Sequence, residues 1–373
     1  MKRILFIFGT RPEAIKLAPL IKAFQKDSKD FKTTICVTAQ HREMLDQVLH
    51  LFKIVPNHDL NLMQENQTLT EITSRVLTEA CKVLEQVKPD MVLVQGDTTT
   101  TFAASLSAFY HKIRIGHVEA GLRTGNKYSP FPEEINRTLT GAMADLHFAA
   151  TTRARDNLRA ENIPAEKIIV TGNTVIDALF WVRGKIKAEN KNFIDLFHPI
   201  DFNKKIVLVT GHRRENFGQR FINLCNALKS LAQSYPDLEI VYPVHPNPNV
   251  KKTVYEYLAS IPNIKLLEPL EYEPFIYLMD KCYFIITDSG GIQEEAPSLG
   301  KPVLVTRNST ERPEAIDVGA AKLVGTDKNM ILKEAIKLLT DPTYYASMSH
   351  INNPFGDGRA SQRIIDVLLN YSY

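Results

Sequence analysis

Ile4-Leu5-Phe6-Ile7-Phe8-Gly9-Thr10-Arg11-Pro12-Glu13 places an apolar run directly before a glycine and a proline that suits the first position of a helix. The run is typical of a buried strand, and the glycine permits the tight turn that ends it. The helix expected over Glu13–Phe24 would carry Leu17, Leu20, Ile21 and Phe24 on one face. A strand followed by such a helix begins a βαβ unit, which predicts a parallel sheet.

The same alternation of short apolar runs and helical patterns continues along the chain. The runs are nearly all apolar, as in strands that are covered on both faces. They lie at Ile4–Phe8, Thr33–Val37, Met91–Val94, Ile113–His117 and Leu146–Ala149, and then at Ile206–Val209, Ile240–Tyr242, Tyr283–Ile286 and Val303–Val305. We therefore predict an α/β protein with two doubly wound domains of similar size.

The expected domains are residues 1–170, an N-terminal domain, and residues 171–353, a C-terminal domain of the same type. Residues 354–373 hold an amphipathic helix that we expect to cross back to the N-terminal domain. Ligands of open α/β sheets bind outside the carboxyl ends of the strands. With two such domains, the expected site is the cleft between them.

Composition excludes several classes of protein. The 373 residues include 45 basic and 42 acidic residues, so the net charge of +3 gives no field that would favour nucleic acid or a membrane surface. The four cysteines form no Cys-x-x-Cys pair, which argues against a zinc site or a disulfide framework. No stretch approaches the ~18 apolar residues of a membrane span, and the first apolar run is too short for a signal peptide. We expect a cytoplasmic protein.

Three carboxylates follow strands or lie in an adjoining loop of the first half. Asp97 follows the strand Met91–Val94, Glu119 follows Ile113–His117, and Glu133 lies four residues before Arg137. Like charges gathered in a cleft suit acid and base roles. The alternative is structural: Asp97 would cap a helix, and Glu119 would pair with Arg123.

Anion-binding features occur in both halves. Arg11 and Lys16 lie at a helix start, where free N–H groups attract phosphate. Ser289-Gly290-Gly291 follows a strand and could form a nest of N–H groups, and Glu295 could accept the hydroxyls of a ribose. The alternatives are an ordinary helix start and a plain glycine turn. His212, followed by Arg213, and His245 come after two further strands and could face the same cleft.

A metal site is the rival explanation for part of this set, because Asp97, His117 and Glu119 are possible ligands. No HxxH-type spacing supports it, and we expect neither a metal nor a cofactor. Phe275 could stack on a base, although core packing explains it equally well.

Taken together, these motifs resemble the non-hydrolysing UDP-N-acetylglucosamine 2-epimerases. The resemblance covers nearly the whole chain, with the motifs in the same order. They are Gly9-Thr10-Arg11-Pro12-Glu13, Gly96-Asp97-Thr98-Thr99-Thr100, His117-Val118-Glu119-Ala120-Gly121-Leu122-Arg123, Pro132-Glu133-Glu134-Ile135-Asn136-Arg137, His212-Arg213-Arg214-Glu215-Asn216, Asp288-Ser289-Gly290-Gly291-Ile292-Gln293-Glu294-Glu295 and Thr310-Glu311-Arg312-Pro313-Glu314.

The resemblance implies two Rossmann-like domains in a glycosyltransferase-B-type arrangement, a homodimer, and reversible conversion of UDP-GlcNAc to UDP-ManNAc for polysaccharide synthesis. The residues that would surround the sugar and the diphosphate are Asp97, Glu119, Glu133, Arg137 and His212. Those that would bind the rest of the substrate are Arg11, Lys16, Arg213, His245, Phe275, Ser289, Gly290, Gly291, Glu295 and Arg312.

Some members of the family are activated by substrate at a second site, whose positions match Gln40, Glu43 and Asn66 here. Many members carry Gln in place of Glu43 and Arg in place of Asn66, and losing that basic group weakens the case for a second nucleotide sugar. Three alternative functions stay open: a hydrolysing 2-epimerase that releases ManNAc and UDP, a UDP-sugar-dependent glycosyltransferase, and a catalytically silent nucleotide-sugar sensor.

Overall fold

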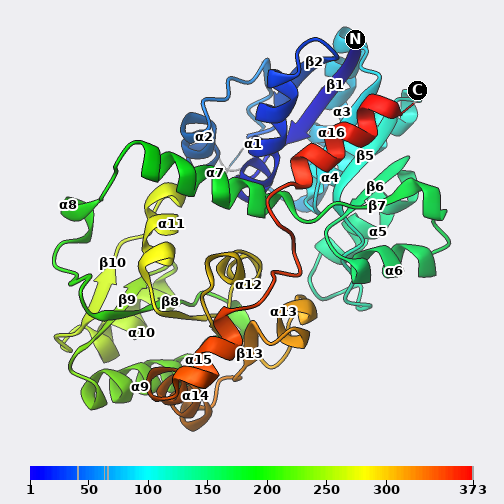
Figure 1. Cartoon of the computed structure of the whole chain (residues 1–373). Helices are drawn as coiled ribbons and strands as arrows, with labels where there is room; N and C mark the ends of the chain where they lie inside the picture. Colours follow the sequence, from blue (N-terminus) through cyan, green and yellow to red (C-terminus); the bar gives the residue numbers. More distant parts are fainter. Residues whose placement is uncertain (40–41, 63, 65–66, 372–373) are drawn as a thin grey trace. The chain divides into compact units, whose positions relative to one another are not determined.

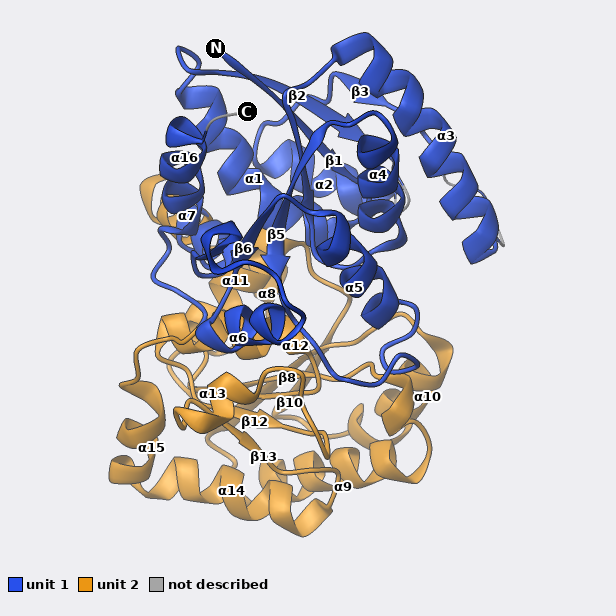
Figure 2. Cartoon of the chain, turned by 90° about the vertical axis from the view of Figure 1, so that its right-hand side faces the viewer, with its two compact units in different colours: residues 1–181, 355–373 blue, residues 182–354 orange. Residues whose placement is uncertain are grey.

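The computed structural model describes residues 1–39, 42–62, 64 and 67–371, and every structural statement below refers to these residues. The chain forms two compact units. Unit 1 comprises Met1–Trp181 and Phe355–Tyr373, and unit 2 comprises Val182–Pro354 (Figure 2). The division falls within helix α7 (Thr174–Ala188).

Unit 1 is built on a seven-stranded sheet with the order β3-β2-β1-β4-β5-β6-β7, in which every described pairing is parallel (Figure 1). The doubly wound sheet predicted from the sequence is therefore confirmed. The strands are β1 (Lys2–Phe8), β2 (Phe31–Val37), β3 (His58–Asp59), β4 (Met91–Gln95), β5 (Arg114–Ala120), β6 (Leu146–Ala149) and β7 (Ile168–Val170).

Alternate residues of β1 point to opposite faces of this sheet. Leu5 and Ile7 belong to a core cluster with residues of α3 and α4, whereas the Phe6 ring lies 5.4 Å from the ring of Phe24 in α1. The helices of unit 1 besides α7 are α1 (Arg11–Lys26), α2 (Arg42–Leu51), α3 (Leu69–Val87), α4 (Thr99–Tyr110), α5 (Glu133–Met143), α6 (Thr152–Ala160) and α16 (Ala360–Asn370), with a 3-10 turn, η1 (Ala165–Lys167).

The C-terminal segment forms hydrogen bonds with the first strand and with α7. The ammonium of Lys2 donates to the carbonyl oxygens of Leu368 and Leu369 at 2.6 and 2.8 Å. The Asp177 carboxylate accepts from the backbone N–H groups of Ala360 and Ser361 at the start of α16. These contacts join the two ends of unit 1.

Unit 2 repeats the architecture with a six-stranded parallel sheet of order β10-β9-β8-β11-β12-β13. Its strands are β8 (Lys205–Thr210), β9 (Leu238–Pro243), β10 (Ile264–Leu267), β11 (Phe284–Thr287), β12 (Val303–Val305) and β13 (Ala321–Leu323). Its helices are α8 (Ile194–Phe197), α9 (Gln219–Ser234), α10 (Pro248–Leu258), α11 (Tyr272–Lys281), α12 (Gly290–Glu295), α13 (Pro313–Asp317), α14 (Lys328–Thr340) and α15 (Pro342–Ser349), with the 3-10 turns η2 (Arg214–Asn216) and η3 (Ala296–Leu299).

Each sheet has one point where the strand order reverses direction. In unit 1 it lies between β1 and β4, and in unit 2 it lies between β8 and β11. The loops that leave the carboxyl ends of two such strands diverge to opposite faces of the sheet and leave a crevice for a ligand. We therefore expect the candidate residues in the loops after these four strands and after β5.

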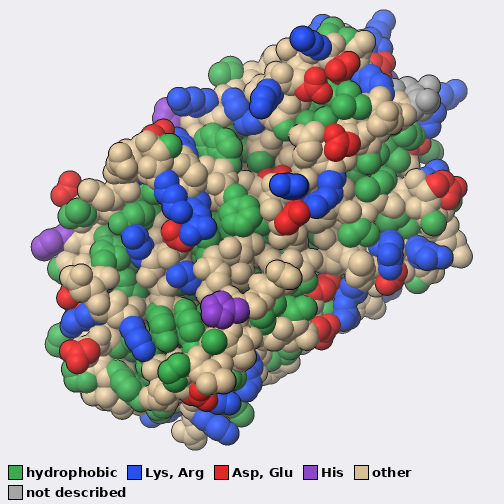
Figure 3. All heavy atoms as spheres, viewed as in Figure 1, with side chains coloured by type: hydrophobic (Ala, Val, Ile, Leu, Met, Phe, Trp, Pro, Cys, Tyr) green, Lys and Arg blue, Asp and Glu red, His purple; other side chains and the backbone are tan. Residues whose placement is uncertain are grey.

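None of the helices in the described part of the chain has the length and hydrophobicity needed to span a bilayer. On the face drawn in Figure 3, basic and acidic side chains are interspersed, in keeping with a net charge of only +3. All four cysteines carry free thiols.

Candidate active site

Glu119 has an unusual backbone conformation in unit 1. Its φ angle is +63°, a region that residues with a Cβ seldom adopt, and the pairing of β5 with β6 shifts register beside it. Such bulges re-aim a side chain, and strain of this kind gathers at functional sites. The sequence placed Glu119 after the strand, which is wrong in detail: β5 continues through the bulge to Ala120.

Glu119 is 7% exposed as a residue, and its carboxylate is held by donors from three separate segments. Lys16 of α1 and Asn173, just before α7, donate to Oε1 at 2.5 and 2.7 Å. Gln95 at the end of β4 donates to Oε2. The ammonium of Lys16 is the counter-ion of this nearly buried carboxylate.

Asp97 follows β4 and pairs with Arg137 of α5, whose Nη2 lies 2.5 Å from Oδ2. The Arg137 side chain is only 5% exposed, and its Nη1 lies 3.3 Å from the Glu134 carboxylate. The helix cap expected of Asp97 is wrong, because Thr98 is the N-cap of α4 and accepts from the N–H of Thr101. The Asp97 carboxylate is thus held by an arginine of α5 just beyond the carboxyl end of β4.

Glu13 connects the loops that follow β1 and β4. It accepts from the N–H groups of Gly9 and Thr10 at 3.1 and 2.8 Å, and from the hydroxyls of Thr98 and Thr101 at 2.9 and 3.1 Å. Burial raises the pKa of Glu13, although these hydrogen bonds oppose the rise. The loops that carry Arg11 and Asp97 are therefore positioned by one carboxylate.

His117 is buried and is held by a backbone carbonyl. Its Nε2 lies 2.7 Å from the carbonyl oxygen of Gly96, and burial lowers its pKa to about 3, so the ring is neutral near pH 7. Within the described residues, no three His, Cys, Asp or Glu side chains are grouped to hold a metal ion.

In unit 2, a buried aspartate organises the loop after β8. The Asp288 side chain accepts from the backbone N–H groups of His212 and Arg213, both at 2.9 Å, and its Oδ1 lies 3.4 Å from Nδ1 of His212. The His212 ring stacks on His245 with the ring centres 5.3 Å apart. Burial lowers the pKa of His212, as do His245 and Arg213, while Asp288 opposes the change.

The Ser289-Gly290-Gly291 turn has two arginines beside it. A Cβ on Gly290 would lie 3.7 Å from Cζ of Arg312 and 3.9 Å from Nη2 of Arg213. Arg312 is in turn paired with the buried Glu294 of α12. Backbone N–H groups at a strand-to-helix turn together with two guanidinium groups suit a diphosphate.

Glu295 lies one turn into α12 and is fixed by Tyr272, whose hydroxyl donates to Oε1 at 2.6 Å. A carboxylate held in a fixed orientation is a group suited to accept hydroxyls. Phe275 lies one turn further along α11 from Tyr272 and is half-buried.

The sequence profile of the family described as UDP-N-acetylglucosamine 2-epimerase matches residues 22–369. The UDP-N-acetylglucosamine 2-epimerase of Yersinia pestis is 56% identical over 372 residues, which cover 99% of each chain. The chain belongs to the UDP-N-acetylglucosamine 2-epimerase family. Membership makes it an epimerase and hence an isomerase, as predicted from its motifs.

Solved structures of other family members agree with this assignment. The crystal structure of the Neisseria meningitidis epimerase bound to UDP-GlcNAc is 52% identical, with a TM-score of 0.93 over 99% of this chain and 100% of that one. The Methanocaldococcus jannaschii epimerase, in complex with UDP-GlcNAc and UDP, is 36% identical with a TM-score of 0.81 over 98% and 99% of the two chains. The predicted fold class, two glycosyltransferase-B-like α/β sheets, is confirmed.

Several of the epimerase residues predicted from sequence come together within each unit. In unit 1, Lys16 meets Glu119 and Arg137 meets Asp97, while Arg11 and Glu133 begin α1 and α5. In unit 2, the predicted residues form two groups. Arg213 and Arg312 lie beside Gly290 of the anion-binding turn, and His212 stacks on His245. Glu295 forms the second group with Tyr272, which donates a hydrogen bond to it. The catalytic and binding roles of these residues, and the cleft, stay predictions.

Of the three positions considered for a second site, Gln40 and Asn66 lie outside the described residues. Glu43 is exposed in the first turn of α2.

The site residues predicted from the sequence do not include five residues that hold the candidate site residues in place. Asp288 was recognisable, because it directly follows a strand, as Asp97 and Glu119 were expected to do. Glu13 was recognisable as the third residue after a threonine N-cap. Gln95, Asn173 and Tyr272 had no signal of their own, because their partners lie 24, 54 and 23 residues away in the chain.

Proposed function

We propose that this chain interconverts UDP-GlcNAc and UDP-ManNAc without hydrolysis, by inverting C2 of the sugar through elimination and re-addition of UDP. The observation that carries the proposal is the full-length likeness to the Neisseria meningitidis epimerase, which binds UDP-GlcNAc. The carboxylates of unit 1 and the anion-binding turn of unit 2 supply the two kinds of group that this reaction needs.

The chemical difficulty is the proton at C2, which has no carbonyl beside it. Breaking the C1–O bond first gives C1 oxocarbenium character and makes that proton acidic. Loss of UDP and of the C2 proton then gives a glycal, an enol-ether-like intermediate. Return of a proton to the opposite face of C2 and of UDP to C1 completes the epimerisation, with no net consumption of water.

Proton removal and delivery on two faces require at least two acid/base groups, and we assign these roles among Asp97, Glu119 and Glu133. A positioned acid or base typically contributes ~10²–10⁴ in rate. The ion pairs with Arg137 and Lys16 are suited to hold two of these carboxylates in fixed orientations while supplying positive charge nearby.

Departure of UDP places negative charge on the β-phosphate. We assign its stabilisation to the Ser289-Gly290-Gly291 turn with Arg213 and Arg312, together with His212 and Arg11. Fixed N–H groups and guanidinium groups aimed at a developing charge are among the most effective catalytic devices. Asp288 can only accept and lies beside Nδ1 of His212, so it favours a proton on that nitrogen. His212 would then donate to the phosphate from Nε2 as the imidazolium, a form that burial opposes and that Asp288 and the departing anion favour.

The nucleoside end of the substrate is assigned to unit 2. Glu295 would accept the ribose hydroxyls in the orientation set by Tyr272. Phe275 would lie beside the uracil, and His245 would support His212 through ring stacking. Exclusion of water from the bound sugar would keep the glycal from being hydrolysed.

The experiment is NMR of UDP-GlcNAc incubated with the pure protein alone. The proposal expects UDP-ManNAc to build up until the ratio becomes constant, and the same ratio to be reached from UDP-ManNAc. Free ManNAc and UDP would instead identify a hydrolysing epimerase, and an unchanged spectrum would favour a glycosyltransferase or a sensor.

The family resemblance also leads us to propose a homodimer. Light scattering should then give about twice the 42.2 kDa of one chain. A mass equal to one chain at working concentrations would contradict this part of the proposal.

A further inference from the structure

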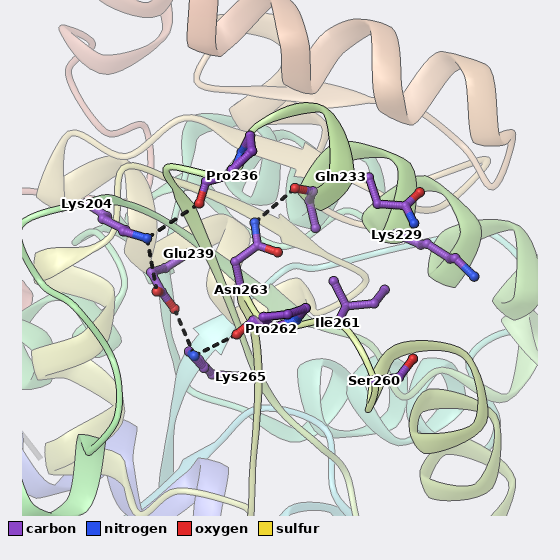
Figure 4. Close-up of a pocket in the computed structure, with 11 residues that line it drawn as sticks. Lys204, Lys229, Gln233, Pro236, Glu239, Ser260, Ile261, Pro262, Asn263 and Lys265 are labelled. Carbon is purple, nitrogen blue, oxygen red and sulfur yellow. Dashed lines mark hydrogen bonds and ion pairs between the residues drawn. The ribbon is translucent and has the colours of Figure 1, made fainter.

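A cavity of about 520 Å³ lies at the amino-terminal edge of the second sheet, and Figure 4 shows the residues that line it. It is at the amino ends of β8, β9 and β10, whereas Ser289-Gly290-Gly291 follows the carboxyl end of β11. Small-molecule sites commonly have volumes of about 300–1,000 Å³. The polar residues that line it are Lys204, Lys229, Gln233, Glu239, Ser260, Asn263 and Lys265.

Glu239 is the unusual member of this set, because it is a carboxylate inside a strand with its side chain only 6% exposed. Its Oε2 has no hydrogen-bond partner within the described chain. The ammonium groups of Lys204 and Lys265 each lie 3.9 Å from the carboxylate, beyond hydrogen-bond reach. A buried acceptor without a donor is costly, so this oxygen favours a ligand that brings one.

Asn263 offers a second acceptor at the centre of the cavity wall. Its amide nitrogen donates to the carbonyl oxygens of Ala232, Tyr235 and Leu238 at 3.0, 3.2 and 3.0 Å. These three carbonyls fix the amide orientation and leave the side-chain oxygen to accept from elsewhere. The acceptor oxygens of Glu239 and Asn263 therefore favour a ligand with several hydroxyl donors.

The charges of the lining residues favour an anionic ligand. Three lysines and one glutamate leave a net charge of +2 on the lining. Figure 4 shows Lys229, from α9, on the far side of Asn263 from Lys204 and Lys265. Lys229 has no hydrogen bond or ion pair with any described residue, so its ammonium is available. A phosphate monoester, at about −1.5 to −2 near pH 7, matches this lining.

We propose that the cavity binds a small phosphorylated sugar. Sugar hydroxyls donate to Glu239 and Asn263, and the phosphate lies against Lys229 and the neighbouring lysines. The proposal concerns a face of unit 2 that takes no part in the proposed epimerisation and does not depend on it.

The test is isothermal titration of glucose 6-phosphate into the full chain, with saturating UDP present to occupy nucleotide-binding residues. Binding is expected to be at least about tenfold tighter than for inorganic phosphate or for glucose. Lys229→Ala should weaken it about tenfold, whereas Lys333→Ala, an exposed lysine of α14 away from the cavity, should leave it unchanged.

A second variant, Glu239→Gln, tests the hydroxyl contact: it should reduce the preference for glucose 6-phosphate over inorganic phosphate. Lys229 is exposed, so Lys229→Ala should keep the thermal midpoint of the parent. Three results would overturn the proposal: no binding, equal affinity for inorganic phosphate and the sugar phosphate, or affinity indifferent to Lys229→Ala.

Discussion

Replacing Glu119 by glutamine separates a catalytic role for this residue from a purely structural one. The ion pair with Lys16 is nearly buried, with side-chain exposures of 4% for Glu119 and 14% for Lys16. Removing one charge of a fully buried pair costs about 3–5 kcal/mol. Because the amide oxygen can still accept from Lys16, which keeps some contact with water, we expect Glu119→Gln to lower the free energy of unfolding by about 2–3 kcal/mol.

Lys16→Met completes a double-mutant cycle. The single change leaves a buried carboxylate without its cation, whereas the double variant Lys16→Met/Glu119→Gln holds two neutral groups. Urea unfolding should therefore give a double variant that is more stable than the sum of the single effects by about 2 kcal/mol. As a control, Glu79→Gln, in the exposed pair with Lys82, should change stability by less than about 0.5 kcal/mol.

Activity should not follow stability. If Glu119 is an acid/base group, kcat of the double variant falls at least about 10²-fold below that of Lys16→Met, even though the fold is restored. The comparison uses kcat at saturating substrate because Lys16 is itself a proposed binding residue. A double variant with the same kcat as Lys16→Met would refute the catalytic role and leave Glu119 as a structural partner only.

Three further predictions concern other parts of the site and its scaffold. Asp288→Asn should lower the free energy of unfolding by about 2 kcal/mol, because it weakens two backbone hydrogen bonds. NMR should show the pKa of His212 lowered further, because Asp288 raises it in the parent. A His212 ring that titrates as in the parent would argue against the pairing. Burial lowers the pKa of His117 to about 3 and of His147 to about 4, so the folded protein binds fewer protons than the unfolded chain at acid pH. Urea unfolding should then show stability falling from about pH 6.5 downward by up to about 1.4 kcal/mol per pH unit for each histidine, with a shallower slope in His147→Leu; an unchanged slope would remove His147 from the account. Gly121→Ala should lose more than about 2 kcal/mol, because φ is +91° and the new Cβ would lie 2.2 Å from a backbone carbonyl oxygen of α6; normal urea unfolding would contradict this.

The central strands of both sheets were predictable because burial on both faces makes them continuous apolar runs, as in Ile4–Phe8 and Ile206–Val209. The outer strands were not. β3 consists of a histidine and an aspartate, and β13 has a lysine at its centre, so no apolar run marks either strand. β7 is apolar but has only three residues, of which one is buried. These strands form because a neighbouring strand offers backbone partners, which local sequence does not record.

The site was predictable where chemistry follows the end of a strand, as with Asp97 and His212. It was less so for Glu119, because a bulge inside β5 turns that side chain and a bulge has no clear mark in the sequence. Partners supplied from distant segments, such as Asn173 for Glu119, depend on the packing of α7 against unit 1 and become visible only in the folded chain.

The account depends most on the transfer of a proton at C2 of the sugar. It is tested by incubating UDP-GlcNAc with the protein in deuterated water and following C2 by NMR and mass spectrometry. We expect deuterium at C2 in UDP-ManNAc, and in the recovered UDP-GlcNAc once the reaction has run in reverse. Epimerised product that keeps its original hydrogen at C2 would contradict the mechanism and the roles assigned to the three carboxylates.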